Sequence, residues 1–461
     1  MINKHDLGGK MKSVRIDMGS DKLLSNIIKY AIPIILSGVL QLFFNAADVV
    51  VVGNYAGDKA LAAVGSTTTL INLLVNLFIG LSIGASVVMG RYYGAKDLKN
   101  ASDTLHTAIS TSIIGGIFLL LLGLFIAKPM LEIIATPSEI INLSTLYMQI
   151  YFCGMPAFMI YNFGAAILRA TGDTKRPLYF LSLAGVVNVL LNLFFVISLN
   201  MSVAGVALAT IISQYISAFL IILSFFKNDD FLKLHLNKLS IKLDKFIPML
   251  KVGIPAGIQA MLFSISNLLI QSSVNSFGHI TVAGNTAASN IEGFIYTSCN
   301  AIYQTCLSFT AYSMGAKRYD RITKIFLICS ILSLLIGETL GISAYLFGSQ
   351  LIAIYNQNSE VIKFGMHRLA IVASFYGICG LMDTMVGSIR AMGYSLLTMF
   401  VSIFGICVFR IFWIFTFFKS SGQIENLYMS YPISWIMTAC FHLISFLIIR
   451  YYLLPKKTAS N

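Results

Sequence analysis

Charged residues are scarce in this chain. Asp, Glu, Lys and Arg make up 11% of its 461 residues, and hydrophobic residues make up 57%, whereas soluble proteins carry about 25% charged residues. Apolar stretches long enough to cross a hydrocarbon core of roughly 30 Å recur along the chain. The first of them, 27–52, holds only Lys29 and Asp48 as charges. This composition excludes a soluble globular domain and indicates an integral membrane protein.

Patterns typical of catalytic and cofactor sites are also missing. None of the seven cysteines forms a Cys-x-x-Cys pair, and all lie within or beside apolar segments, as small buried side chains do. The sequence has no metal-ligand spacing, no glycine-rich phosphate loop and no Ser/His/Asp signature. We therefore expect neither an enzyme nor a bound cofactor.

Apolar runs between polar breaks predict twelve membrane-spanning helices, because only helices satisfy the backbone of such segments in lipid. The net charge of +13 does not indicate a nucleic-acid partner, since 26 of the 32 Lys and Arg residues fall in the termini and in every second loop. The positive-inside rule then places both termini in the cytoplasm. Arg169 and Arg390 lie at the ends of spans on this basic side, where we expect their long side chains to snorkel toward the membrane surface. The predicted spans are 27–52, 66–89, 104–127, 141–168, 178–199, 203–226, 247–275, 285–312, 324–349, 364–389, 396–418 and 428–450.

A short signature occurs twice, 221 residues apart. Gly-Ala-Lys at 94–96 returns at 315–317, and Arg-Ala-x-Gly at 169–172 returns at 390–393. Self-similarity of this kind indicates an internal duplication. Six spans per half is an even number, so the halves are parallel repeats, and transporters built in this way hold their site between the repeats. We predict an all-α integral membrane protein of twelve transmembrane helices, arranged as two parallel six-helix repeats with a central cleft.

The duplication defines the expected domains. Residues 27–226 form an N-lobe and residues 247–450 form a C-lobe. The polar segment 227–246 is expected to connect them in the cytoplasm, either as a solvated connector or as a helix on the inner leaflet. Residues 1–26, which contain no apolar core of the signal-peptide type, and residues 451–461 are expected to be cytoplasmic tails.

Several segments resemble the multidrug and toxic compound extrusion (MATE) family of transporters. They are NAADVVVVGNYAGDKALAAVG (45–65), VMGRYYGAKD (88–97), ILRATGDTKRP (167–177), FTAYSMGAKRYDRITK (309–324) and SIRAMG (388–393). The resemblance covers nearly the whole chain and is closer to DinF-like bacterial exporters than to NorM-like ones. It implies export of amphipathic, often cationic organic compounds across a bacterial inner membrane, coupled to H⁺ or Na⁺. Small organic molecules and membrane lipid are the expected partners, and the monomer is the expected functional unit.

Carboxylates inside spans are costly, roughly 2.5–3.5 kcal/mol at a helix centre, so each one is a functional candidate. Asp48 matches the acidic residue that the family carries in its first helix, which implies that it binds the coupling H⁺ or Na⁺. The alternative is an interfacial carboxylate near the end of the span. Asn188 and Asn192 share one helical face, where related branches carry Asn-x-x-x-Asp. Thr210 and Tyr147 resemble polar residues near that cluster, although interhelical hydrogen bonds explain these four residues equally well.

The candidate substrate residues lie mainly in the second half. Glu292 in the eighth span is expected to face the central cleft, since related bacterial sequences often carry an acid there. Asp383 in the tenth span lies a turn or more from the position where NorM-like members carry an aspartate. Amides of the first and seventh spans add hydrogen-bonding surface to the cleft, namely Gln41, Asn45, Gln259 and Gln271.

Two other kinds of function remain open from the sequence. A lipid-linked oligosaccharide flippase of the wider superfamily is disfavoured by the count of twelve spans, because those proteins usually have fourteen. A non-transporting membrane receptor or scaffold would not need duplicated lobes with buried carboxylates. Gradient-dependent uptake would distinguish a transporter from a receptor.

Overall fold

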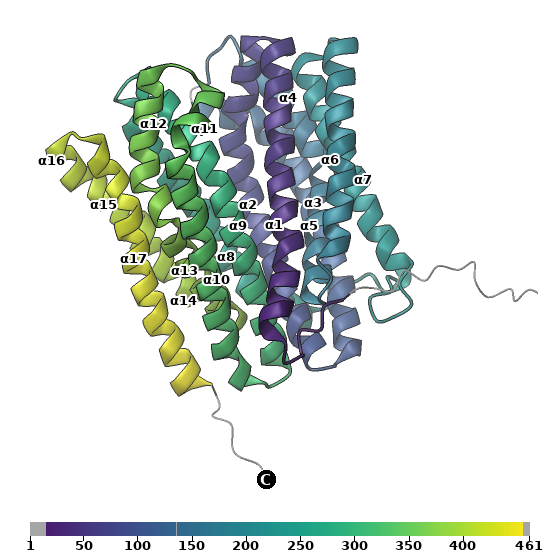
Figure 1. Ribbon diagram of the computed structural model, residues 1–461. Coiled ribbons are helices and arrows are strands. Elements are labelled where there is room, and N and C mark those ends of the chain that lie inside the picture. Colours follow the sequence, from purple (N-terminus) through teal and green to yellow (C-terminus); the bar gives the residue numbers. More distant parts are fainter. Residues whose placement is uncertain (1–14, 135, 455–461) are drawn as a thin grey trace, which may run out of the picture.

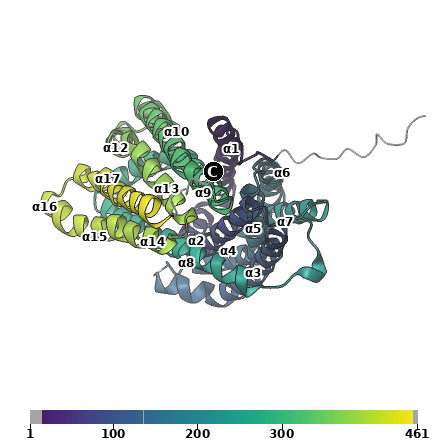
Figure 2. The same ribbon diagram turned by 90° about the horizontal axis from the view of Figure 1, so that it is seen from below.

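The structure, a computed structural model, describes residues 15–134 and 136–454. These residues form helices and connecting turns, with no strand among them. The helices run along one axis, with α1–α7 on one side of the bundle and α8–α17 on the other (Figures 1 and 2). They are α1 (Leu23–Val51), α2 (Asp58–Gly94), α3 (Leu98–Ile133), α4 (Ile141–Cys153), α5 (Met155–Ala170), α6 (Lys175–Asn192), α7 (Ser202–Phe226), α8 (Leu243–Asn275), α9 (His279–Gly315), α10 (Tyr319–Leu346), α11 (Gly348–Tyr355), α12 (Ser359–Ile371), α13 (Tyr376–Ala391), α14 (Ser395–Ser402), α15 (Phe409–Trp413), α16 (Lys419–Ser421) and α17 (Ile424–Ile448).

Within residues 15–134 and 136–454, ten helical segments are each long and apolar enough to cross a membrane. An eleventh span is made of α4 and α5, which are bent by 47° at their junction. The twelfth is α9, whose 37 residues give a length of about 55 Å in spite of its polar side chains. The predicted all-α fold with six spans in each half is confirmed.

The internal duplication is visible in the backbone turns. Lys96 and Lys317 adopt left-handed conformations with φ of 57° and 55°, so both Gly-Ala-Lys segments are turns that end a helix. Gly57 and Gly278, which are also 221 residues apart, have φ of 85° and 88° and precede α2 and α9. Glycine is favoured there because it lacks the Cβ atom that makes positive φ costly.

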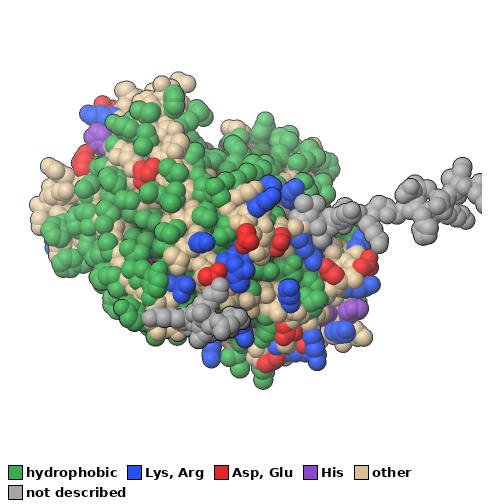
Figure 3. Space-filling view, turned by 60° about the horizontal axis from the view of Figure 1, so that its bottom comes forward, with side chains coloured by type: hydrophobic (Ala, Val, Ile, Leu, Met, Phe, Trp, Pro, Cys, Tyr) green, Lys and Arg blue, Asp and Glu red, His purple; other side chains and the backbone are tan. Residues whose placement is uncertain are grey.

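Lys and Arg side chains gather at one end of the bundle, which we call the basic end (Figure 3). It carries both ends of the described chain and the turns after α2, α5, α7, α9 and α13. The first helix of each lobe begins four residues before its predicted boundary, at Leu23 and at Leu243. The connector between the lobes is therefore shorter than predicted. It contains a 3₁₀ turn, Leu236–Lys238, and no longer helix.

The lobes pack closely along α2, α8 and α9. A Cβ atom on Gly84 would overlap the carbonyl oxygen of Met249, and one on Gly315 would overlap that of Arg91. Glycine permits this approach of two backbones. The Arg91 guanidinium also donates a hydrogen bond to the carbonyl oxygen of Ala391 at 2.7 Å. The interface between the lobes is thus closed toward the basic end.

The segment just before α1 contacts both lobes at the basic end. The Ile16 N–H donates to the carbonyl oxygen of Gly172 in the N-lobe at 3.0 Å. Arg321 of the C-lobe donates to the carbonyl oxygens of Gly19 and Ser20, both at 2.6 Å. Because the same short segment is bonded to each lobe, it stabilises the closed basic end.

Candidate functional site

The N-lobe cluster is centred on Asp48, a half-buried residue of α1. Its carboxylate accepts a hydrogen bond from the side-chain amide of Asn192 on α6. The same nitrogen donates to Oδ1 of Asn188, one turn earlier, at 3.3 Å. Both asparagines are buried, and in the described part of the chain Oδ1 of Asn192 has no hydrogen-bond partner. Packing of α1 against α6 therefore brings these three residues together.

Two tyrosines of α4 lie beside this cluster. Tyr147 is 8% exposed, and both it and Tyr151 lie within electrostatic range of Asp48. Their rings stack with centroids 6.1 Å apart. Tyr151 was not among the predicted site residues, although its i, i+4 spacing from Tyr147 is a usable signal. The Thr210 hydroxyl instead donates to the carbonyl oxygen of Val206 in its own helix, at 3.0 Å.

Asp48 has no basic partner among residues 15–134 and 136–454. A carboxylate held away from water without a cation is costly, and binding of H⁺ or of a small cation removes that cost. Carboxylate and amide oxygens suit hard cations, so the unpaired Asn192 oxygen is an additional ligand atom. Within the described residues, no group of three His, Cys, Asp or Glu side chains could hold a metal ion. Any cation here would therefore depend on one carboxylate and neutral oxygens.

Gln41 and Asn45 extend the same face of α1. They precede Asp48 at helical spacing, and both are exposed. Close by, Phe43 of α1 contacts Phe294 of α9, with ring centroids 5.4 Å apart. Phe43 is two residues from each amide, so it lies on the other side of α1, and the two amides face away from this contact with the C-lobe.

Glu292 on α9 forms a bidentate ion pair with Arg368 on α12. Nε and Nη2 of the arginine donate to the two carboxylate oxygens at 2.9 and 2.7 Å, and Nη1 donates to Oδ1 of Asn285 at 2.8 Å. Glu292 is 2% exposed, so the expected cleft-facing acid is instead half of a buried pair. Sequence reasoning missed Arg368, although an arginine within a predicted span needs a partner.

A chain of amides continues from this ion pair. The Asn285 side chain accepts a hydrogen bond from the Tyr428 hydroxyl at 3.2 Å and donates to Oε1 of Gln271 at 2.9 Å. Gln271 in turn donates to Oδ1 of Asn275 at 2.9 Å. Gln271 therefore belongs to the Glu292 network.

Arg390 on α13 is buried, which corrects its interpretation as a snorkelling anchor. Its guanidinium donates to the Tyr303 hydroxyl at 2.6 Å and to Oε1 of Gln259 at 2.9 Å. Asp383, two turns earlier on the same helix, is half-buried and lies within electrostatic range of Arg390 and Tyr296. In the part of the chain that the structure describes, the Asp383 carboxylate has no hydrogen bond or ion pair.

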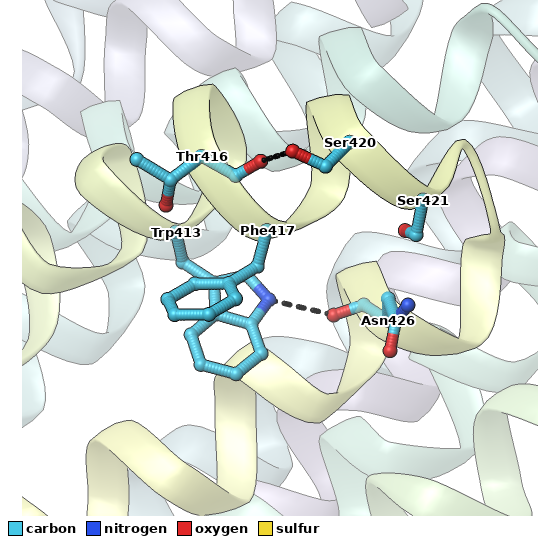
Figure 4. Close-up of a pocket in the computed structure, with 6 residues that line it drawn as sticks. All are labelled: Trp413, Thr416, Phe417, Ser420, Ser421 and Asn426. Carbon is cyan, nitrogen blue, oxygen red and sulfur yellow. Dashed lines mark hydrogen bonds between the residues drawn. The ribbon is translucent and has the colours of Figure 1, made fainter.

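A hollow of about 500 Å³ lies away from these clusters, between α17 and the π-helical turn Ile414–Phe418 (Figure 4). The Trp413 indole donates to the carbonyl oxygen of Asn426 at 2.7 Å. No charged side chain and no predicted site residue lines the hollow, so we do not assign it to the candidate site. Its lining residues are Trp413, Thr416, Phe417, Ser420, Ser421 and Asn426.

The family model MatE matches residues 33–194 and 255–416, one segment in each lobe. The chain belongs to the MATE family. It is 28% identical to the probable multidrug resistance protein YpnP of Bacillus subtilis, over 94% of this chain and 96% of the relative. It is 27% identical to the probable multidrug resistance protein YoeA of Bacillus subtilis, over 82% of this chain and 83% of the relative.

The fold agrees with solved MATE structures. It aligns with an outward-facing conformation of a multidrug resistance MATE family transporter of the MOP superfamily, with a TM-score of 0.90 and 20% identity. The alignment covers 96% of this chain and 99% of the other. This MATE protein is therefore a multi-pass membrane protein of a transporter family.

Proposed function

We propose that this MATE protein is a secondary exporter of amphipathic, often cationic organic compounds, driven by antiport of H⁺ or Na⁺ at Asp48. The observation that carries the proposal is the Asp48 carboxylate, which is bonded to the Asn192 amide and has no basic partner in the described chain. The names of the relatives support multidrug resistance as the role. The protein acts in a bacterial inner membrane with its basic end in the cytoplasm, as a monomer and without a cofactor.

The closed basic end represents one of two states in this mechanism. In this state the protein releases its substrate on the opposite side and binds the coupling ion at Asp48. The lobes then separate at the basic end, where the contacts of Gly84, Arg91 and the segment before α1 must break. Coupling requires that ion binding and substrate binding favour different states. Gln41 and Asn45 support such a link, because they stand beside Asp48 on one helix face.

Export of ethidium, a fluorescent cation, tests the proposal. Cells or inverted vesicles carrying wild type should move ethidium when energised, and Asp48→Asn should lose most of this transport at equal protein abundance. Glu338→Gln is the matched control, because it removes another carboxylate from a span, outside the N-lobe cluster. Equal export by Asp48→Asn would refute the role of Asp48. Binding of ethidium without gradient-dependent movement would indicate a receptor or scaffold.

A further inference from the structure

Arg410 is a buried arginine inside the membrane-spanning part of the C-lobe. It lies on α15, within the span Ser395–Ser421, and is 4% exposed. Its Nε donates to the Ser434 hydroxyl oxygen at 3.0 Å, and its Nη1 donates to Oδ1 of Asn267 at 3.4 Å. Both acceptors are neutral, so these bonds leave the positive charge uncompensated.

Among the described residues, no acid forms an ion pair with Arg410. The groups with the strongest electrostatic influence on it are Tyr431, Cys379, Cys407 and Tyr376, none of which is a carboxylate. The other three buried arginines of the C-lobe differ from it. Arg368 pairs with Glu292, Arg390 lies near Asp383, and Arg321 donates to two carbonyl oxygens at the basic end. A cation that is kept in a membrane span without a counter-charge is costly and marks a functional site.

One guanidinium nitrogen of Arg410 is free to bind. Nη2 has no hydrogen-bond partner among the described residues. Other unbonded nitrogens and oxygens of the described residues are fully enclosed, but Nη2 is not one of these enclosed atoms. The nitrogen is therefore not completely enclosed, although the residue as a whole is only 4% exposed. The neighbouring Asn267 of α8 is exposed, which places the approach along α8. The long Nη1 bond to Asn267 leaves both terminal nitrogens able to form the two-pronged contact that arginine makes with carboxylate and phosphate.

Aromatic rings hold the guanidinium in place. Its carbon lies 4.1 Å from the centroid of Tyr431 and 5.9 Å from that of Trp435, both on α17. Cation–π contacts orient an arginine without cancelling its charge. Tyr431 is 9% and Trp435 is 5% exposed, so the apolar body of a ligand whose acidic group reaches Nη2 would lie against the exposed edges of these rings.

We propose that the C-lobe binds the acidic group of an amphipathic ligand at Arg410, with the apolar part of that ligand against Tyr431 and Trp435. The acidic group is a carboxylate, sulfonate or phosphate, carried by a free amphiphile or by a lipid. This site extends the ligands of the protein beyond cationic compounds. Its binding can be measured without transport, so the test does not depend on coupling at Asp48.

The two tryptophans of the chain provide the measurement. Trp413→Phe leaves Trp435, beside Arg410, as the one indole whose fluorescence reports on the site. Hexanoate, hexanesulfonate and butyl phosphate should change this emission saturably in purified protein in phosphatidylcholine nanodiscs. Hexylammonium and hexanol, which carry the same apolar chain, should not. Equal responses to hexanoate and hexylammonium would overturn the proposal.

Substitution of Arg410 in the Trp413→Phe background sharpens the test. Arg410→Gln should weaken hexanoate binding about 30-fold or more, because it removes one member of a buried charge pair, whereas Arg410→Lys should retain part of it. Lys419→Gln is the matched control, since it removes an exposed positive charge from the same span, and it should bind like its parent. Unchanged binding by folded Arg410→Gln would contradict the proposal.

Two further measurements complete the test. The first keeps Arg410 and so does not depend on whether a substituted protein folds, and the second distinguishes a lipid ligand from a free amphiphile. With Arg410 intact, iodide should quench Trp435 more strongly than caesium, and hexanoate should protect against iodide. Quenching that is equal for the two ions would count against the site. Nanodiscs that contain phosphatidylglycerol identify a lipid ligand if they alone change the emission and abolish the response to hexanoate. A persisting response to hexanoate identifies a free amphiphile.

Discussion

The two lobes share a backbone plan but hold their charges in different ways. The N-lobe cluster has one carboxylate, Asp48, bonded to an amide. The C-lobe has Glu292 and Asp383 together with four buried arginines. At the 221-residue offset, Asp48 corresponds to Leu269 and Glu292 corresponds to Ile71. The duplication therefore preserved the scaffold, with the Lys and Arg of the repeated signatures, but not the carboxylates within the spans.

This difference distinguishes a carboxylate that can bind an ion from solution from a carboxylate whose counter-charge is part of the protein. The Arg368 guanidinium belongs to the protein and neutralises Glu292 in place, so Glu292 needs no ion from solution. Asp48 has no such partner in the described chain, and a mobile ion can fill that role. We infer that the N-lobe suits ion coupling and that the C-lobe suits structural support and ligand recognition.

Removal of the Glu292 charge should have the largest effect on stability. Glu292→Gln leaves Arg368 buried without a counter-charge, which costs about 3–5 kcal/mol, so thermal unfolding in detergent should shift strongly downward. Asp48→Asn should leave the unfolding temperature unchanged or raise it. The double variant Glu292→Gln/Arg368→Gln should be less destabilised than the sum of the single variants. A small shift of the unfolding temperature in Glu292→Gln would show that the two lobes do not differ in how much a span carboxylate contributes to stability.

Closer packing between the lobes should have an intermediate effect. Gly84→Ala places a methyl group against the backbone at Met249, and overpacking of this kind costs about 1–3 kcal/mol. The cost falls on the state with a closed basic end, so a thiol probe should react faster with a cysteine introduced at the basic end between the lobes. Gly65→Ala on the same helix brings its new Cβ within 4 Å of no described atom outside its own helical turn, and it should react like its parent. Equal reactivity of the introduced cysteine in the parent, in Gly84→Ala and in Gly65→Ala would argue against closure at Gly84.

A second carboxylate in the N-lobe should have the smallest of these effects. Asn192→Asp places two carboxylates side by side, which repel each other unless a cation or a shared proton lies between them. Its affinity for Na⁺ should rise at least about tenfold, a change of about 1.4 kcal/mol, as measured by binding of radioactive sodium. Gln259→Glu, which adds an acid beside Arg390 in the C-lobe, should not gain sodium binding. An equal gain in both variants would remove the distinction between the lobes.

The fold could be predicted from the sequence because span length and loop charge are local properties. The i, i+4 spacing of Asn188 and Asn192 and the family position of Asp48 also indicated the N-lobe cluster. Partners in the C-lobe could not be predicted, because they depend on how separate helices are rotated against each other. The direction of Arg390, for example, depends on Tyr303 and Gln259 from two other helices.

Transport in proteoliposomes under a pH gradient alone and under a sodium gradient alone tests the central claim most directly. One of the two gradients should drive ethidium accumulation by wild type. Asp48→Asn should lose this accumulation and still exchange ethidium across the membrane when no gradient is imposed. Accumulation by Asp48→Asn that equals wild type under the driving gradient would show that the coupling ion does not bind at Asp48.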